Sequence, residues 1–188
     1  MTRIIAGEFG GRSLAVPKSG TRPTTDRVRE AVFSRLDHAS SVRGVSVVDL
    51  FAGSGALGFE ALSRGASHAT FVESALPAVR VIEQNIRTLG AGTRAEVVRE
   101  RAAAYLTRTQ DTYGLALIDP PYDLPPGDLL AVLEALVPRL EVGASVVLEA
   151  ARRSGSPEWP RGLEVVQTKQ YGDTTVSFAE RVAMPRVR

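Results

Sequence analysis

Apolar and polar residues follow one another along most of the chain in short blocks that alternate between strand-like and helix-like patterns. Short runs rich in β-branched residues predict strands at 45–50, 69–73, 95–99, 115–119 and 145–149. Between them, apolar residues at helical spacing predict helices at about 56–65, 75–89, 101–108 and 127–138. Two further alternating runs predict an antiparallel hairpin at 163–171 and 174–182.

This order of elements predicts an α/β domain built on a seven-stranded sheet. Strands that alternate with helices form a parallel sheet covered by helices on both faces. The terminal hairpin adds a final strand that runs antiparallel, whereas a plain dinucleotide-binding fold more often stays parallel to its last strand. We therefore expect a Rossmann-like, mostly parallel sheet with an antiparallel final strand.

The first 44 residues follow a different pattern. Residues 3–17 predict two short strands about a glycine turn. After an extended linker, Thr25 predicts the N-cap of a helix whose apolar face comprises Val28, Ala31, Val32 and Leu36. We expect a small β-hairpin extension over residues 1–20 and a main domain over residues 21–188.

The composition narrows the class of protein. The chain of 188 residues is 44% hydrophobic and 23% charged, as is usual for globular domains. It has no cysteine, which excludes a disulfide framework, a thiol nucleophile and a thiolate metal site and suits a reducing cytosol. No apolar run approaches the roughly 20 residues of a membrane span, and the N-terminus lacks a signal-peptide pattern. We expect a cytoplasmic monomer with no metal site and no membrane segment.

Positive charge gathers at the N-terminal end. The net charge is only +2, yet residues 1–35 hold seven arginines and lysines against three acids. A basic end on a near-neutral body is typical of a weak binding surface for a polyanion. A solvated basic surface explains the same charges, and the charge pattern alone leaves both interpretations open.

A glycine loop follows the first strand of the predicted sheet. Gly53, Gly55 and Gly58 have the spacing G-x-G-x-x-G, which lets a backbone turn approach a ligand closely. Asp49 stands at the end of that strand, and a carboxylate there disfavours the pyrophosphate of NAD. It favours S-adenosylmethionine, whose ammonium and sulfonium groups are cationic. Such an attraction is worth about 4 kcal/mol at about 4 Å near a protein surface.

A second acid ends the next predicted strand. Glu73 stands 18 positions after Gly55, where a carboxylate can accept hydrogen bonds from both hydroxyls of a ribose. NAD and S-adenosylmethionine both contain that ribose, so Glu73 indicates an adenosyl ligand and Asp49 distinguishes between the two. The alternative, in which both acids merely end strands, agrees less well with their joint placement.

The tetrapeptide Asp119-Pro120-Pro121-Tyr122 marks the end of a later predicted strand. An exocyclic amino group of a nucleobase is a poor nucleophile, because its lone pair is delocalised into the ring. Asp119 and the Pro120 carbonyl can each accept one of its N–H groups and aim the lone pair at a methyl group. Tyr122 can stack on a base taken out of its helix. We predict a catalytic role for Asp119, Pro120, Pro121 and Tyr122; the alternative is a turn that only ends a strand.

Four stretches, in this order, resemble one protein family. They are "RIIAGEFGGRSLAVP" (3–17), "RPTTDRVREAVFSRL" (22–36), "DLFAGSGALGFEALSRGA" (49–66) and "DPPY" (119–122). Together they resemble the RsmD family, bacterial 16S ribosomal RNA guanine-N2 methyltransferases, over essentially the whole chain. The glycine loop and the tetrapeptide occur in many methyltransferases, whereas the first two stretches are more specific. The resemblance implies a class I methyltransferase fold and S-adenosylmethionine as the methyl donor.

The resemblance implies three groups of cofactor-binding residues. Around the methionine end and the ribose they are Asp49, Phe51, Ala52, Gly53, Ser54, Gly55, Glu73 and Ser74. Beside the adenine they are Arg101 and Ala102. Over the carboxylate of the cofactor they are Thr24, Asp26 and Arg29.

The resemblance also implies a substrate and the residues that bind it. The family's target is the N2 amine of guanine 966 in 16S rRNA, presented on the small (30S) ribosomal subunit or a late precursor of it. The N-terminal hairpin and its basic residues would dock on this RNA, with Arg3, Arg12, Lys18 and Arg22 as candidates. On the side of the target base, the candidates are Tyr171 and Thr174.

Other functions fit parts of the sequence. The nearest alternative is the same chemistry on an exocyclic amine of another RNA or DNA base, because the sequence alone does not distinguish one amine from another. Enzymes that modify a glutamine side chain favour Asn at the position of Asp119. An NAD-dependent oxidoreductase is disfavoured by Asp49, and an inactive RNA-binding module is disfavoured by the intact tetrapeptide.

Overall fold

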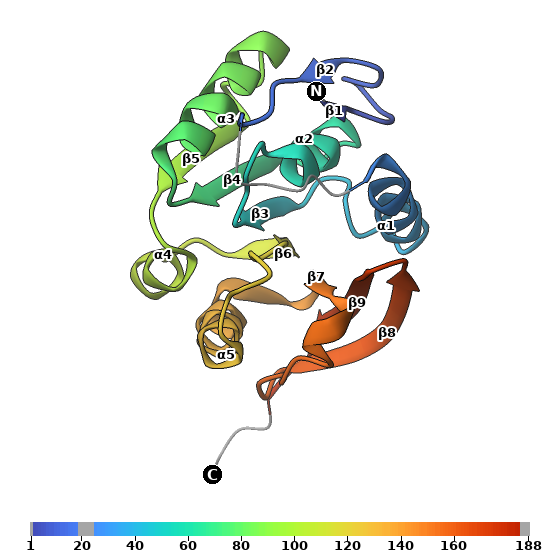
Figure 1. The fold of residues 1–188 in the computed structure, drawn as a ribbon, viewed down its shortest axis with the longest axis vertical. Coiled ribbons are helices and arrows are strands. Elements are labelled where there is room, and N and C mark those ends of the chain that lie inside the picture. Colours follow the sequence, from blue (N-terminus) through green and yellow to red (C-terminus); the bar gives the residue numbers. More distant parts are fainter. Residues whose placement is uncertain (1, 19–24, 185–188) are drawn as a thin grey trace.

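The structure is a computed structural model that describes residues 2–18 and 25–184. Arg22 and Thr24, two of the candidate site residues, lie outside the described residues. Figure 1 shows a central twisted sheet with helices on both sides, and a small pair of strands beside it near the N-terminus.

The sheet has seven strands within the described residues. They are β3 (Ser46–Leu50), β4 (His68–Glu73), β5 (Ala95–Arg99), β6 (Tyr113–Ile118), β7 (Leu140–Ala151), β8 (Leu163–Tyr171) and β9 (Thr174–Arg181). They lie in the order β5-β4-β3-β6-β7-β9-β8 (Figure 1). Strands β3 to β7 pair in parallel, and β9 runs antiparallel to both β7 and β8. The predicted mostly parallel sheet with an antiparallel final strand is confirmed.

The helices divide between the two faces of this sheet. They are α1 (Asp26–His38), α2 (Ala56–Ser63), α3 (Leu76–Leu89), α4 (Ala102–Arg108) and α5 (Pro126–Leu136), with short 3₁₀ turns at Val137–Arg139 and Arg152–Ser154. Buried side chains of α1, α2 and α3 belong to one hydrophobic cluster, and those of α4 and α5 belong to a second. In the described part of the chain, no helix is long and apolar enough to cross a membrane.

Most element boundaries lie within a few residues of their predicted positions, because local signals set them. The Thr25 hydroxyl accepts the N–H of Val28 at the start of α1, and Gly90 ends α3 with a φ of 67°. The prediction is wrong for β7, which runs from 140 to 151 because it pairs with β6 and β9 well beyond its apolar run. Strand β6 ends one residue early, so that Asp119 lies in the following loop.

The N-terminal strands β1 (Thr2–Arg3) and β2 (Ser13–Leu14) form the predicted antiparallel hairpin. Its apolar side chains Ile4, Phe9 and Leu14 are buried in the same cluster as those of α1, α2 and α3. The hairpin therefore contributes to the core that covers one face of the sheet.

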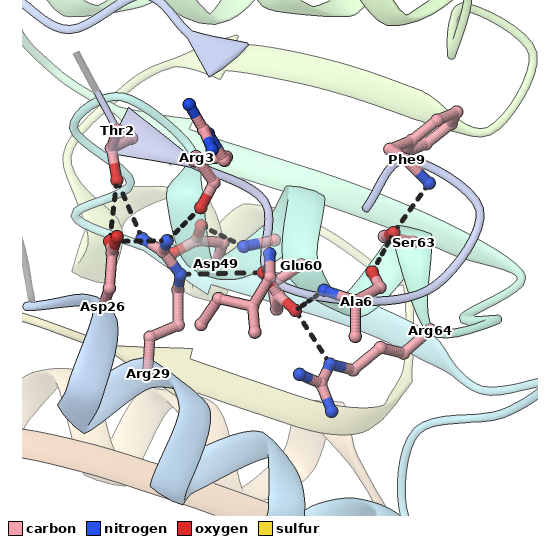
Figure 2. Close-up of polar contacts among 12 residues, drawn as sticks. Thr2, Arg3, Ala6, Phe9, Asp26, Arg29, Asp49, Glu60, Ser63 and Arg64 are labelled. Carbon is pink, nitrogen blue, oxygen red and sulfur yellow. Dashed lines mark hydrogen bonds and ion pairs between the residues drawn. The ribbon is translucent and has the colours of Figure 1, made fainter. Parts of the chain in front are cut away.

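A buried ion pair joins these strands to α1 and α2 (Figure 2). The side chains of Arg29 on α1 and Glu60 on α2 have no exposed area, and Arg29 Nε lies 3.6 Å from Glu60 Oε2. The Arg29 guanidinium also donates to the Thr2 hydroxyl at 3.1 Å, to Asp26 at 3.0 Å and to the Arg3 carbonyl. One cation thus holds three segments together.

The Glu60 carboxylate is the other centre of this network. It accepts the backbone N–H groups of Ile5 at 2.8 Å and Ala6 at 3.2 Å, and Nε of Arg64 at 2.8 Å. Figure 2 shows the N-terminal segment held against α2 through these contacts. The carboxylate therefore replaces hydrogen bonds that the backbone after β1 would otherwise make with water.

We expect Glu60→Gln to lower the free energy of unfolding by about 3–5 kcal/mol, because it removes the buried negative charge that faces Arg29 and Arg64. Glutamine keeps the size of the side chain and one acceptor oxygen, so the loss reports the charge and the hydrogen bonds of the second oxygen. Urea unfolding followed by circular dichroism measures it.

Asp37→Asn is the matched control for this variant. It removes the carboxylate of an ion pair with Arg64, 2.7 Å apart, in which the Asp37 side chain is 44% exposed. Its loss should stay below about 1 kcal/mol, as for other exposed pairs. Equal losses in the two variants would contradict the importance of the buried charge.

Candidate active site

The loop between β3 and α2 turns sharply at the carboxyl end of the sheet. Positive φ angles of 58°, 58° and 81° occur at Phe51, Gly53 and Gly55. Gly58 lies inside α2, where a Cβ atom would come within 2.3 Å of the Phe71 ring. The glycine pattern therefore serves two purposes: it permits the turn, and it lets α2 pack closely against β4.

Asp49 lies beneath this loop, near the end of β3, and is 1% exposed. Its Oδ2 accepts the N–H of Gly58 in the first turn of α2, at 2.9 Å. Burial raises the pKa of Asp49 well above its ordinary value, although the Gly58 hydrogen bond opposes this shift. The negative charges of Asp119 and Glu73 raise the pKa further. A cation bound beside these groups would stabilise the ionised form of Asp49.

Glu73, at the end of β4, fixes the glycine loop from the other side. Its two carboxylate oxygens accept the backbone N–H groups of Gly53 at 2.9 Å and Ala75 at 2.8 Å. An ionised carboxylate offers about four acceptor positions, so two of these bonds leave capacity for a ligand hydroxyl. Glu73 is half-buried, which keeps part of its surface accessible.

A row of carboxylates follows this edge of the sheet, one from each of four neighbouring strands. The carboxylate row consists of Glu73 on β4, Asp49 on β3, Asp119 directly after β6 and Glu149 on β7. The strand register pairs Asp49 with Leu117 and Ile118 with Leu148, which brings these acids to the same end of their strands. Among the described residues, no group of three or more potential ligand side chains is arranged to hold a metal ion. The four acids concentrate negative charge at this edge of the sheet, which favours a cationic ligand.

A cavity of about 430 Å³ opens next to Asp119, between α1 and the turn that joins β8 to β9. It is lined by Thr25, Arg27, Val28, Asp119, Tyr122, Glu149, Gln170, Tyr171, Gly172, Asp173 and Thr174. Its volume lies within the range of about 300–1,000 Å³ that small-molecule sites occupy. Asp119 is half-buried and Tyr122 is 44% exposed. The tetrapeptide thus stands where the carboxylate row meets the cavity.

The structure brings several predicted residues together at this cavity. Tyr171 and Thr174, predicted from the hairpin on the target-base side, line it with Asp119 and Tyr122. Pro120 is buried and Pro121 is exposed, and the Pro121 carbonyl accepts the N–H of Leu124 at 3.0 Å. This turn holds Tyr122 at the mouth of the cavity.

The remaining cofactor candidates lie along the same edge of the sheet. Ala52 and Ser54 are buried within the glycine loop, and Ser74 follows directly on β4. Arg101 is the exposed N-cap residue of α4, and Ala102, which begins the helix, is buried. These positions extend the candidate site from β3 to β5.

The two arginines at the start of α1 point in different directions. Arg29, a predicted cofactor-binding residue, is fully buried and engaged by the N-terminal strands, so it presents no surface to a ligand. Arg27, which the sequence analysis did not single out, lines the cavity instead. Residues two positions apart on a helix point about 200° away from each other, which explains the difference. Asp26 has an exposed side chain that accepts a hydrogen bond from Arg29.

The basic candidate residues of the hairpin differ in their surroundings. Arg3 and Lys18 are exposed. Arg12 donates from its guanidinium to the carbonyls of Thr88 and Leu89 at the end of α3. Arg12 therefore has a structural partner within the chain.

The sequence analysis missed one residue of the site, Glu149, and the structure shows a structural residue, Asn85, that supports the glycine loop. Glu149 ends the apolar run "SVVLE", as Asp49 and Glu73 stand at the ends of theirs. Asn85 on α3 donates to the carbonyls of Ala15 at 3.0 Å and Ser54 at 3.1 Å, which ties the hairpin to the glycine loop. No local pattern reveals the role of Asn85, because its partners are distant in sequence.

Comparison with known proteins finds relatives that match nearly the whole chain. A family model described as conserved hypothetical protein 95 matches residues 2–180. Ribosomal RNA small subunit methyltransferase D of Escherichia coli (strain K12) is 36% identical over 188 residues, 96% of this chain and 90% of that protein. YlbH of Bacillus subtilis (strain 168) is 36% identical over 184 residues, 95% of this chain and 98% of that protein. The solved structure of Escherichia coli yhhF has a TM-score of 0.86 at 34% identity, covering 97% of this chain and 98% of its own.

We expect Asp49→Asn to raise the melting temperature at pH 8. In a domain of this size the rise is about 2–4 °C for each kcal/mol gained in the free energy of unfolding. The folded protein raises the pKa of Asp49. The protonated Asp49 carboxyl therefore makes its full contribution to stability below the unfolded-state pKa of about 3.9. This contribution is lost as the pH rises through the folded-state pKa. Asparagine removes the buried charge and keeps an oxygen for the Gly58 N–H.

Thermal unfolding between pH 4 and pH 9 measures this effect. The advantage of Asp49→Asn should shrink as the pH falls towards 4, because the wild-type carboxyl is then protonated. Glu83→Gln, at an exposed acid on α3, should show no such trend and serves as the control. A variant less stable than the wild type at every pH would contradict the prediction.

Proposed function

The chain belongs to the RsmD family, and we propose that it transfers the methyl group of S-adenosylmethionine to an exocyclic amine of a base in 16S ribosomal RNA. The observation that carries the proposal is the position of Asp119 and Tyr122 between the carboxylate row and the cavity. Asp49 and Glu73 in the row suit a cationic methyl donor, and the cavity suits a base that approaches it. The Escherichia coli relative, named as a methyltransferase of small-subunit ribosomal RNA, supports this class of substrate.

The carboxyl ends of β3, β4 and β5 are the proposed binding site of S-adenosylmethionine. The charges of Asp49 and Glu73 attract its ammonium and sulfonium groups, whereas they would repel the pyrophosphate of NAD. Glu73 keeps acceptor positions for the ribose hydroxyls. The loop residues Phe51, Ala52, Gly53, Ser54 and Gly55 form the rest of this site, with Ser74, Arg101 and Ala102 beside them.

Asp119, Pro120 and Tyr122 are the proposed catalytic groups. S-adenosylmethionine supplies a methyl group on a sulfonium, and transfer of that group to nitrogen leaves a neutral thioether. Asp119 and the Pro120 carbonyl accept the two N–H groups of the target amine and so aim its lone pair at the methyl group. Tyr122 stacks on the base. The methylated amine then releases one proton, for which Asp119 supplies a carboxylate base.

Within 16S rRNA, we propose the N2 amine of a guanine as the target, presented on the small subunit or a late precursor. We propose residues 1–20 as the part that docks on the RNA and residues 21–188 as the part that carries the catalytic site. The protein would act as a monomer in the cytoplasm, where ribosomes assemble. An exocyclic amine of another base is the alternative target.

We expect Asp119→Ala to lower methyl transfer to small ribosomal subunits about 10²–10⁴-fold, the range typical of a lost acid–base group. The assay measures transfer of a labelled methyl group to subunits from a strain that lacks this methylation. Asp123→Ala is the matched control, because Asp123 is an exposed acid in the same loop. Equal activity of Asp119→Ala and wild type would contradict the catalytic role.

Two measurements complete this test. Calorimetry should show binding of S-adenosylmethionine and no binding of NAD, with Asp119→Ala retaining most of the cofactor affinity. Mass spectrometry of the methylated RNA should locate the methyl group on N2 of a guanine. Binding of NAD alone would overturn the proposal, and a methylated adenine or cytosine would favour the alternative target.

We expect the double variant Arg3→Ala with Lys18→Ala to bind subunits more weakly and with a less steep dependence on salt, because two exposed cations are lost. Each lost phosphate contact should reduce the slope of log K against log salt by about 1. Arg161→Ala, at an exposed position before β8, serves as the control. A loss of cofactor affinity as large as the loss of subunit affinity would contradict a docking role.

A further inference from the structure

We propose that Glu149 recognises the target base as a guanine, by accepting the N1–H group next to the amine that Asp119 holds. This inference rests on the proposed function and names the residue that selects its substrate. It assigns a role to the fourth member of the carboxylate row, which the proposed cofactor site and catalytic groups do not use.

Glu149 lies near Asp119 at the end of β6. The register of β6 and β7 pairs Ile118 with Leu148, so Asp119, which directly follows β6, and Glu149 on β7 each come one residue after this pair. Neighbouring strands lie about 4.8 Å apart, which is close enough for two side chains to reach adjacent atoms of one base. Both residues line the same cavity of about 430 Å³.

Glu149 is a buried carboxylate in a largely apolar part of the strand. It is 4% exposed, and it is paired on β9 with Val176, which is fully buried. An apolar residue would occupy this position at a lower desolvation cost than a carboxylate. An ionised carboxylate offers about four acceptor positions, so a contact within the protein leaves capacity for a base. Its place on the cavity wall directs that capacity towards the substrate.

The Watson–Crick edges of the bases explain why two neighbouring carboxylates select guanine. Guanine presents its N2 amine next to N1–H, so it offers donors to both carboxylates. Adenine presents its amine next to an unprotonated N1, and cytosine presents its amine next to an unprotonated N3. Both ring nitrogens are acceptors, which Glu149 would repel because an ionised carboxylate only accepts. The arrangement therefore favours guanine over the other bases that carry an exocyclic amine.

The cavity also contains hydrogen-bond donors that suit the O6 end of the guanine edge. Oxygen O6 of guanine is an acceptor and needs a donor. Arg27 on α1 and Gln170 on β8 line the cavity and carry N–H donors. Donors and acceptors are thus available for all three groups on the edge of a guanine.

A base analogue tests the role of Glu149 directly. 2-Aminopurine keeps the 2-amine of guanine but has an unprotonated N1 and lacks O6. Small subunits are reconstituted with guanine or 2-aminopurine at the position that the wild type methylates. We expect the wild type to prefer guanine by at least about 10- to 100-fold in kcat/KM, the range for one base-specific polar contact. Glu149→Gln should reduce this preference, because an amide N–H can donate to the unprotonated N1, and the part that remains reports the contacts to O6.

Two further variants separate recognition from folding. Glu149→Asp keeps a carboxylate and should keep the preference for guanine at a reduced rate. Asp173→Asn changes an exposed carboxylate on the rim of the same cavity and should keep the wild-type preference. Affinity for S-adenosylmethionine, measured by calorimetry, should be the same in all three variants as in the wild type.

The outcomes distinguish this inference from the proposed function. If the wild type methylates guanine and Glu149→Gln keeps the full preference over 2-aminopurine, the role of Glu149 is overturned and the proposed function stands. If the wild type methylates an adenine or a cytosine, recognition of N1–H is overturned while methyl transfer stands. If the wild type transfers no methyl group to 16S rRNA, both are overturned.

Discussion

The buried ion pair between Arg29 and Glu60 is the constraint on which the site depends. Neither side chain has exposed area, so both charges need partners within the protein, and Arg29 also contacts Asp26 while Glu60 also contacts Arg64. Helices α1 and α2 and strand β1 therefore have to meet at this point. Helix α2 begins directly after the glycine loop, and α1 contributes Thr25, Arg27 and Val28 to the cavity. The pair therefore holds the proposed cofactor side and the cavity side of the site in a fixed relation.

The carboxylate row has the opposite character, because it concentrates like charges. Burial and the neighbouring charges of Asp119 and Glu73 raise the pKa of Asp49, so the protein without a ligand holds this charge at a cost. A cationic ligand removes part of that cost when it binds. The repulsion among these carboxylates, which destabilises the folded protein, would thus increase its affinity for a cation. Functional sites often contain groups that lower stability in this way.

Much of the fold could be predicted because its signals are local. Short apolar runs predicted β3 to β6, and the glycine turn after residue 171 predicted the β8–β9 hairpin. Thr25 and Gly90 predicted the ends of helices. The candidate site was predictable only in part. Acids at strand ends were recognisable at Asp49 and Glu73, whereas Glu149 gained meaning only beside Asp119, 30 positions away. The choice between Arg27 and Arg29 depended on which face of α1 the N-terminal strands covered.

The sequence by itself determined the α/β order, the sharp glycine turn, the acids at the strand ends and the rigid tetrapeptide. Each of these features depends on a short stretch of consecutive residues. Only the tertiary structure decided which of these residues share a surface. It buried Arg29 against Glu60, brought Tyr171 to Tyr122, and aligned four acids from four strands. The physical reason is that pairing between distant segments depends on strand register and on the burial of charge, and neither is recorded in a short stretch of sequence.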